Sequence, residues 1–298
     1  MASFDDDLTS TIIGMECAAL DRWGKGDPSG FLEICAPDVV YSDPNLERRI
    51  DGRDALSKYY DGIRGKVSLQ RYKLLADSST GSLFEADVYD LDLFDTDASM
   101  VAALQAQGYR VICYISVGSW EDWRPDAGQF PPEVIGNDYE GWPGEKWLDI
   151  RSLEKLAPIL RARLDLCAAK GFDAVEPDNM DGFTNDTGFP LTAADQLRFN
   201  IWLAEEAHQR GLSIGLKNDP DQAAELEPYF DWALTEDCFA DGWCEQMLPF
   251  IEAGKAVLAA EYTDTGVSLG EICPLAAQMQ FSVILKNRDL DAYRATCP

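Results

Sequence analysis

Histidine is almost absent from this chain. The 298 residues contain one, His208, which lies in a predicted helix beside Arg210 and is expected to be a solvated surface residue. Without a second histidine, Ser-His-Asp or Cys-His catalysis lacks its general base, and a zinc site of the usual Cys/His spacing lacks ligands. No glycine-rich phosphate loop of the GxGxxG or GxxxxGK[ST] type occurs. We therefore expect neither a metal nor a cofactor.

Basic residues are also scarce. There are 25 Lys plus Arg against 53 Asp plus Glu, which gives a formal net charge of −28. A nucleic-acid partner is not expected, because binding to phosphates requires basic side chains, and the same reason excludes an anionic membrane surface. A cationic or neutral ligand is compatible with the charge. Alternatively, the net negative charge serves only to keep the protein soluble.

Long apolar runs are missing as well. No stretch reaches the roughly 18 to 20 residues that span a bilayer. The acidic amino terminus has no basic region followed by an apolar stretch, so no secretory signal is expected in the chain as written.

None of the eight cysteines forms a CxxC pair. We expect Cys113, in an apolar strand, and Cys167, on a helix, to be small core residues. Two pairs late in the chain are candidate disulfides: Cys238 with Cys244, and Cys273 with Cys297.

Residues 76–83 are mostly small and polar, as is typical of a linker. They separate two segments with different predicted secondary-structure patterns. Residues 1–75 have an α+β pattern, with helices predicted at Leu8–Trp23 and Gly52–Gly62 and strands at Val39–Pro44 and Ser68–Leu75. Residues 84–298 form the second predicted domain.

In the second domain strands alternate with helices, which predicts a parallel sheet with helical crossovers. Helices are expected at Ala98–Gln107, Leu153–Lys170 and Thr192–Arg210, each followed closely by a glycine that suits a left-handed cap. A closed barrel of eight strands needs one more strand before these, and Tyr72–Ala76 is a poor candidate for it. Seven strands are expected, at Val88–Leu93, Arg110–Val117, Ala174–Asp178, Ser213–Lys217, Ala233–Glu236, Val257–Glu261 and Ser282–Lys286.

Acidic, amide and aromatic residues gather at the carboxyl ends of these strands, the edge where a (β/α)8 barrel holds its active site. Carboxylates and amides pair with sugar hydroxyls, and aromatic faces stack on a pyranose ring. A single acid at such a place could equally cap a helix or pair with Arg or Lys. So many acids at one rim would repel each other without a purpose, and the set therefore indicates a sugar site.

Glycoside hydrolysis requires two carboxyl groups, one to protonate the leaving oxygen and one to attack the anomeric carbon or activate water. Asp178 and Glu236 end strands that are two apart around the predicted barrel, so both can point into one pocket. We predict that these two residues are catalytic. The sequence leaves open whether the reaction proceeds with retention or inversion.

Six motifs in one order resemble glycoside hydrolase family 114, over about residues 84–298. They are DVYDLDLFD at 87–95, CYISVGSWEDWRPD at 113–126, WLDIR at 147–151, VEPDNMD at 175–181, GLKND at 215–219 and EDC at 236–238. The resemblance implies a (β/α)8 TIM-type barrel and an endo-acting hydrolase of α-1,4-linked polysaccharide that contains galactosamine. Such a polymer is partly unacetylated and cationic, which agrees with an acidic cleft. The resemblance also implies an extracellular location, and we expect a monomer.

The resemblance assigns roles to both carboxylates. Similarity to barrels that cleave α-galactosides with retention implies that Asp178 is the nucleophile and Glu236 the general acid/base. Ten further residues are then expected to contact the sugar or support the catalytic acids: Asp90, Asp92, Tyr114, Glu121, Arg124, Asp149, Asn179, Asp181, Lys217 and Tyr262.

The amino-terminal part of the chain differs from this family, whose barrels begin with a strand rich in Trp and Gln. We therefore expect a barrel that lacks its usual first strand, preceded by a small α+β segment. Residues 18–75 instead resemble the first half of a polyketide-cyclase-like cone domain of the nuclear transport factor type, through WGKGD at 23–27, APDVVYSD at 36–43 and IDGR at 50–53. Two alternatives stay open: a catalytically impaired carbohydrate-binding barrel, and a fusion in which a small-molecule-binding cone domain is the functional part.

Overall fold

A computed structural model of the chain describes residues 32–33, 40–41, 50–51, 53–63, 86–291 and 293–297. The chain divides into two compact units, Met1–Val67 and Ser68–Pro298. The domain bounds expected from the sequence stay a prediction. The helix expected at Leu8–Trp23, the strand at Ser68–Leu75 and the extra barrel strand at Tyr72–Ala76 lie outside the described residues.

The described part of the first unit contains two short strands, the helix α3 and two further helical residues, Leu32 and Glu33. β1 (Val40–Tyr41) pairs antiparallel with β2 (Ile50–Asp51), and α3 (Arg53–Ile63) follows directly. Leu56 on α3 is buried. The strand and the helix predicted for this stretch are confirmed.

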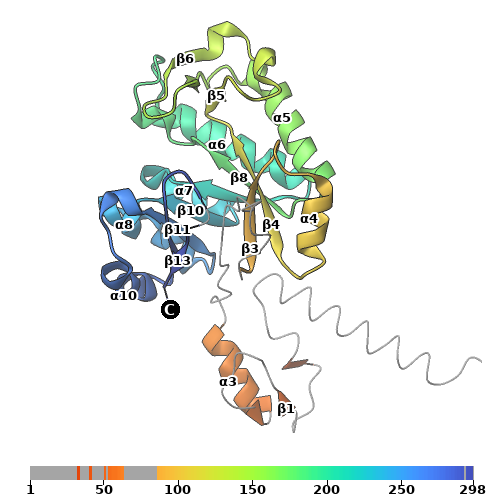
Figure 1. The fold of residues 1–298 in the computed structure, drawn as a ribbon, viewed down its shortest axis with the longest axis vertical. Helices are drawn as coiled ribbons and strands as arrows, with labels where there is room; N and C mark the ends of the chain where they lie inside the picture. The colour runs from red at the N-terminus through yellow and green to blue at the C-terminus, as the bar shows by residue number, and fades with distance from the viewer. Residues whose placement is uncertain are drawn as a thin grey trace, which may run out of the picture. The chain divides into compact units, whose positions relative to one another are not determined.

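The second unit is an α/β barrel of the TIM type, built on one curled sheet of eight strands (Figure 1). Neighbours from β3 to β12 are parallel, and β13 pairs antiparallel with β12. The seven predicted strands are confirmed, each within one residue of its expected bounds. Among the described residues, β3 pairs only with β4. The order across the sheet is β13 (Ala295–Thr296), β12 (Ser282–Lys286), β11 (Val257–Tyr262), β10 (Trp232–Glu236), β9 (Ser213–Lys217), β8 (Ala174–Asp178), β4 (Arg110–Ser116) and β3 (Val88–Asp92).

The helices cover the outer face of the sheet, as α4 does beside β3 and β4 (Figure 1). α5 ends at Gly171, whose φ of 85° is the expected left-handed cap. Thr192 and Asp195 form a capping box at the start of α6, where each side chain accepts a backbone N–H. The helices are α4 (Ala98–Gln105), α5 (Leu153–Lys170), α6 (Ala193–Gln209), α7 (Ala223–Leu226), α8 (Cys238–Asp241), α9 (Leu248–Glu252) and α10 (Leu269–Met279).

A small antiparallel sheet that was not predicted lies between β4 and α5 in sequence. It consists of β5 (Ser119–Glu121), β7 (Glu145–Leu148) and β6 (Ile135–Asp138), in that order. Figure 1 shows β5 and β6 beyond the carboxyl ends of the parallel strands. This insertion therefore supplies side chains to the edge of the barrel that carries the predicted site. Short 3-10 helices occur at Ala127–Gln129, Pro132–Val134, Gly182–Thr184, Pro220–Gln222, Glu227–Tyr229, Cys244–Met247 and Thr263–Thr265.

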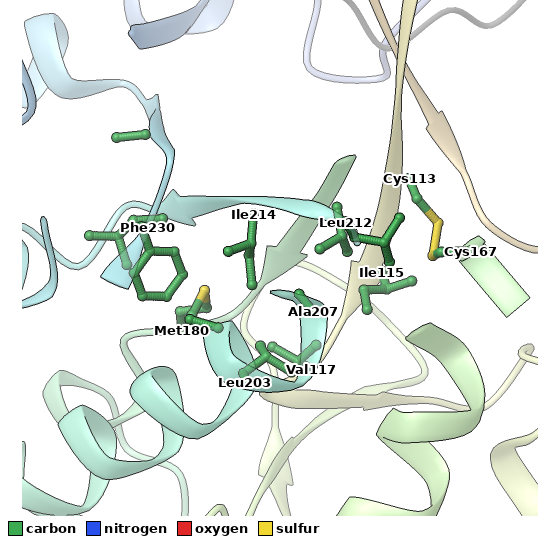
Figure 2. Close-up of a cluster of buried hydrophobic side chains, with 14 of the residues drawn as sticks. Cys113, Ile115, Val117, Cys167, Met180, Leu203, Ala207, Leu212, Ile214 and Phe230 are labelled. Carbon is green, nitrogen blue, oxygen red and sulfur yellow. A yellow bond between two sulfur atoms is a disulfide. The ribbon is translucent and has the colours of Figure 1, made fainter. Parts of the chain in front are cut away.

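The parallel strands separate two cores, because successive side chains on a strand point to opposite faces. On β4, Cys113 and Ile115 face outward and join the cluster that contains Leu203 of α6 (Figure 2). Ile112, on the other face of β4, belongs to a second cluster inside the barrel. We name this cluster the barrel floor: Val88, Ile112, Ala174, Trp232, Leu234 and Leu258.

The barrel floor fixes which side chains point into the site above it, since residues two apart on a strand share a face. On β9 the floor is filled by the ring of Trp232, because Gly215 has no side chain there. A Cβ on Gly215 would lie 2.1 Å from that ring, and Lys217 follows two positions later. On four other strands, the floor residues Val88, Ile112, Ala174 and Leu234 are each followed two positions later by a polar side chain. These side chains are Asp90, Tyr114, Glu176 and Glu236, respectively.

Three disulfides are present among the described residues. The two expected ones, Cys238–Cys244 and Cys273–Cys297, are confirmed. The expectation that Cys113 and Cys167 are unpaired core residues is wrong, because they form the third disulfide (Figure 2). Both are fully buried as predicted. The packing of α5 against β4 brings them together across a sequence separation of 54 residues.

Replacement of both Cys113 and Cys167 by alanine is expected to lower the free energy of unfolding by about 4 kcal/mol, since a long loop loses its closure in the unfolded chain. The pair Cys238 and Cys244 closes a loop of only 6 residues, so its removal is expected to cost about 2 kcal/mol. Urea unfolding followed by near-ultraviolet circular dichroism measures both. A larger loss of unfolding free energy on removal of the Cys238–Cys244 disulfide would contradict this dependence on loop length.

Candidate active site

A cavity of about 410 Å3 lies at the carboxyl ends of the parallel strands. Asp149 is not among its lining residues. It pairs instead with Arg151, whose Nε lies 2.7 Å from its Oδ1. The remaining predicted site residues all line the cavity: Asp90, Asp92, Tyr114, Glu121, Arg124, Asp178, Asn179, Asp181, Lys217, Glu236 and Tyr262.

Lys217 lines this cavity, and its ammonium group contacts three carboxylates. Its Nζ lies 2.9 Å from Glu176 Oε1, 3.0 Å from Asp178 Oδ1 and 3.1 Å from Glu236 Oε2. The lysine side chain is only 3% exposed. Both predicted catalytic acids are therefore held on one buried cation. We call these four residues the Lys217 cluster.

Hydrogen bonds from outside the cluster orient both predicted catalytic carboxylates. Tyr114 donates its hydroxyl to Asp178 Oδ2 at 2.8 Å, and the backbone N–H of Asn179 donates to Oδ1 at 2.9 Å. Tyr262 donates its hydroxyl to Glu236 Oε1. The guanidinium of Arg288 lies over the Tyr262 ring, 4.0 Å from its centroid, and fixes that ring from the other side.

Burial and charge act together on the groups of the cluster. Burial alone would lower the pKa of Lys217, but Asp178, Glu176 and Glu236 hold that pKa well above its usual range. The lysine is therefore a permanent cation. Burial, and then the charge of the neighbouring carboxylate, raises the pKa of Tyr114 and of Tyr262. Both tyrosines are consequently permanent hydrogen-bond donors.

The chain leaves these strands through residues in the left-handed region, which asparagine and aspartate tolerate better than most other residues. Asn179, Asn218 and Asp237 follow β8, β9 and β10 with φ of 65°, 51° and 57°. These turns direct polar groups back toward the site. The Asn218 side-chain oxygen accepts the backbone N–H of Glu236 at 2.8 Å, which positions the end of β10.

Sequence reasoning missed a buried polar network beneath Asn179. The Asn179 side-chain amide donates to Ser116 and Ser119 at 2.9 Å and to Glu145 Oε1 at 3.0 Å. Ser119 also donates to Glu145. Burial, and then the charge of Asp178, raises the pKa of Glu145 to about 7 although its hydrogen bonds oppose the shift. Glu145 lies on β7 of the insertion, and no local pattern could have linked it to Asn179.

Arg124 pairs with two of the acids expected to contact sugar. Its Nη1 lies 2.6 Å from Asp92 Oδ2, and its Nε lies 2.7 Å from Glu121 Oε2. The ring of Phe94 lies against the same guanidinium, with 5.4 Å from Cζ to its centroid. Asp92 and Glu121 thus share the single positive charge of Arg124, and these three residues line one part of the cavity.

Other cavity residues were also missed. Glu176 could have been found, because it lies two positions before Asp178 on β8 and so shares its face. Trp123 and Trp142 lie on irregular segments and are 50% and 48% exposed. Such aromatic faces can stack on sugar rings. Within the described residues, no three His, Cys, Asp or Glu side chains are placed to hold a metal ion.

Two family models match the chain. Glycoside-hydrolase family GH114 matches residues 66–298, and the SnoaL-like domain matches residues 18–81. The search of curated proteins found no match.

Solved structures with the same barrel are similar to most of the chain. Aspergillus fumigatus Ega3, in complex with galactosamine, is 38% identical over 76% of this chain and 93% of its own, with a TM-score of 0.70. The glycoside hydrolase domain of PelA from Pseudomonas aeruginosa is 16% identical over 71% of this chain and 91% of its own, with a TM-score of 0.54, and shows the fold alone. The chain therefore belongs to glycoside-hydrolase family GH114, and it is a glycoside hydrolase.

Proposed function

We propose that the chain cleaves an α-1,4-linked, galactosamine-containing polysaccharide internally, with Asp178 and Glu236 as its catalytic pair. The observation that carries the proposal is the contact of both carboxylates with one buried ammonium group, Lys217, in the wall of the cavity. The similarity to Ega3, whose structure contains galactosamine, supports the sugar. The acidic cavity supports a substrate with positive charge.

In the proposed reaction, Asp178 attacks the anomeric carbon while Glu236 protonates the leaving oxygen. Water then opens the glycosyl-enzyme ester with Glu236 as the base. The shared contact with Lys217 keeps one oxygen of each acid within about 6 Å of the other. The two acids are therefore close enough for this retaining path, in which the carboxyl groups lie ~5 to 5.5 Å apart.

The surroundings of each acid support this division of roles. Asp178 accepts hydrogen bonds or an ion pair on both oxygens, from Tyr114, Asn179 and Lys217, which fix it as a positioned anion. The Glu236 side chain is more exposed than that of Asp178, at 33% against 20%. The general acid/base must exchange a proton with water between turnovers, so the more exposed carboxyl suits it.

We also propose an extracellular location. Three disulfides, one of them in the core between Cys113 and Cys167, support an oxidising compartment. No helix in the described part of the chain is long and apolar enough to cross a membrane. A monomeric state and the lack of nucleic-acid partners stay predictions.

Asp178→Asn and Glu236→Gln are each expected to reduce cleavage of partly deacetylated α-1,4-galactosaminogalactan by a factor of at least about 1,000. The two variants should differ on an aryl α-galactosaminide, whose leaving group needs no protonation. Glu236→Gln should still release a burst of aryl alcohol, whereas Asp178→Asn should not. Binding without turnover by the folded wild type would instead favour the impaired carbohydrate-binding barrel.

Retention predicts that the first reducing sugar released is the α-anomer. Proton magnetic resonance of a digest, recorded within minutes of adding enzyme, distinguishes the anomers before mutarotation. Initial appearance of the β-anomer would mean inversion and would exclude Asp178 as a nucleophile.

Asp181 predicts a pH dependence of binding. Desolvation, and then the charge of Asp178, raises its pKa to about 6, with Glu236 acting in the same direction and Lys217 against it. The group is an anion above this pH and neutral below it. KM for the cationic polymer should therefore rise as the pH falls through about 6. Asp181→Asn should remove this rise, and a rise of equal size in the variant would contradict the assignment.

A further inference from the structure

Glu145, on β7 of the insertion, is linked to the proposed nucleophile through a single residue, Asn179. The Asn179 side-chain amide donates to Glu145 Oε1 at 3.0 Å, and the Asn179 backbone N–H donates to Asp178 Oδ1 at 2.9 Å. Glu145 is buried. The two-carboxylate reaction has no step for a third acid, so this contact calls for another role.

The hydrogen bonds around the Asn179 amide run in one direction. A hydroxyl has one hydrogen and donates only once. Ser119 donates its hydrogen to Glu145, so its oxygen can only accept, from Asn179. Ser116 therefore supplies the hydrogen of its contact with Ser119, and its own oxygen also accepts from Asn179. Because three acceptors surround this point, the Asn179 amide must present its NH2 group there and not its oxygen.

The backbone at Asn179 depends on such an anchor. Its φ of 65° lies in the left-handed region, which residues other than glycine adopt at a cost. The Asp178 carbonyl accepts the backbone N–H groups of Val117 and Gly118, at 3.1 and 3.3 Å. The Asn179 carbonyl lies so close to Gly118 that an added Cβ there would be 1.7 Å from it. The peptide whose N–H orients Asp178 is thus held through its carbonyl by residues 117 and 118, and through the Asn179 side chain by Glu145.

The small sheet of the insertion fixes Glu145 itself. β7 pairs antiparallel with β5, and Glu145 lies opposite Glu121. The Glu145 carbonyl accepts the backbone N–H of Tyr139 at 2.8 Å, and its own N–H donates to the Trp142 carbonyl at 3.1 Å. The backbone of Glu145 therefore has hydrogen-bond partners on both its N–H and its carbonyl, which hold its side chain beneath Asn179.

We propose that Glu145 is a positioning residue for the nucleophile and that it acts through Asn179. Its carboxyl oxygen orients the Asn179 amide, and the Asn179 backbone N–H in turn holds Asp178 Oδ1 in the orientation for attack. The role requires an acceptor oxygen at position 145 but no charge. The inference rests on the proposed function, since Asp178 is the nucleophile only in that reaction.

Two substitutions of Glu145 separate an acceptor from a charge. Glu145→Leu removes the acceptor and fills its space, which keeps water from replacing it. Its kcat on partly deacetylated α-1,4-galactosaminogalactan is expected to fall at least about tenfold with little change in KM, because a small displacement of a reacting group slows the chemical step. Glu145→Gln keeps an acceptor oxygen and is expected to retain more than about half of the wild-type kcat.

Two results with these variants would overturn the proposal. A higher KM with unchanged kcat in Glu145→Leu would mean that Glu145 contacts the sugar. An equal loss of kcat in Glu145→Gln and Glu145→Leu would mean that the charge is required.

Asn179→Gly tests the same link from its other end. Glycine keeps the backbone N–H and adopts a positive φ readily, but it has no amide to bind Glu145. The loss of kcat is expected to match that of Glu145→Leu within about threefold, and the double variant should lose no more than the worse single variant. Losses that multiply in the double variant would show that Glu145 acts independently of Asn179. If Glu145→Leu does not fold, a wild-type kcat in Asn179→Gly would still reject the link.

Glu140→Ala is the matched control. It removes an exposed acid of the same insertion that does not line the cavity, and its kcat should equal that of the wild type. A loss as large as that of Glu145→Leu would overturn the assignment to Glu145. Far-ultraviolet circular dichroism establishes that each variant is folded.

Failure of the proposed function is recognisable separately, because the wild type would then cleave no polymer. Crystal structures of the wild type and of Glu145→Leu decide the inference in that case. A turned Asn179 amide and a lost contact between its N–H and Asp178 Oδ1 would support the link. Unchanged positions of both residues would reject it.

Discussion

The active site depends on one buried ammonium group. Three carboxylates within about 3 Å of Lys217 could not ionise together without a cation between them, because like charges this close raise the free energy of ionisation. Conversely, a lysine that is 3% exposed could not remain charged without those acids. The Lys217 cluster is therefore stable only as a whole. It keeps Asp178 and Glu236 close together and leaves their other oxygens to Tyr114 and Tyr262.

The position of the cluster follows from the alternation of the strands. The barrel floor fills the interior at one level, and the next inward positions on the same strands carry Asp90, Tyr114, Glu176 and Glu236. Gly215 contributes by having no side chain, because the Trp232 ring occupies the space that a Cβ would need. Lys217 thus emerges above an apolar layer that excludes water from below, where its interactions with carboxylates are stronger than they would be in water.

The sequence could predict what depends on local pattern. The strand ends and the choice of Asp178 and Glu236 as the predicted catalytic acids both follow from residues close together in the chain. Contacts between distant segments could not be predicted. Glu145 reaches Asn179 only through the insertion, and Cys113 meets Cys167 only after α5 packs on β4. Asp149 was expected in the site because it belongs to one of the motifs that resemble the family, yet it pairs with Arg151, two residues along, and does not line the cavity.

Solubility alone does not explain the acidic character of the site. A charge that keeps a protein soluble is most effective on the surface, whereas Glu145 and Asp219 are buried. Desolvation raises the pKa of Glu145 to about 7 and that of Asp219 to about 8. A raised carboxyl pKa favours the folded state fully below the ordinary value near 4, and this advantage is lost as the pH rises through the folded value. Near neutral pH these acids therefore reduce stability. Acids kept at such a cost support the proposal of a ligand that brings its own positive charge.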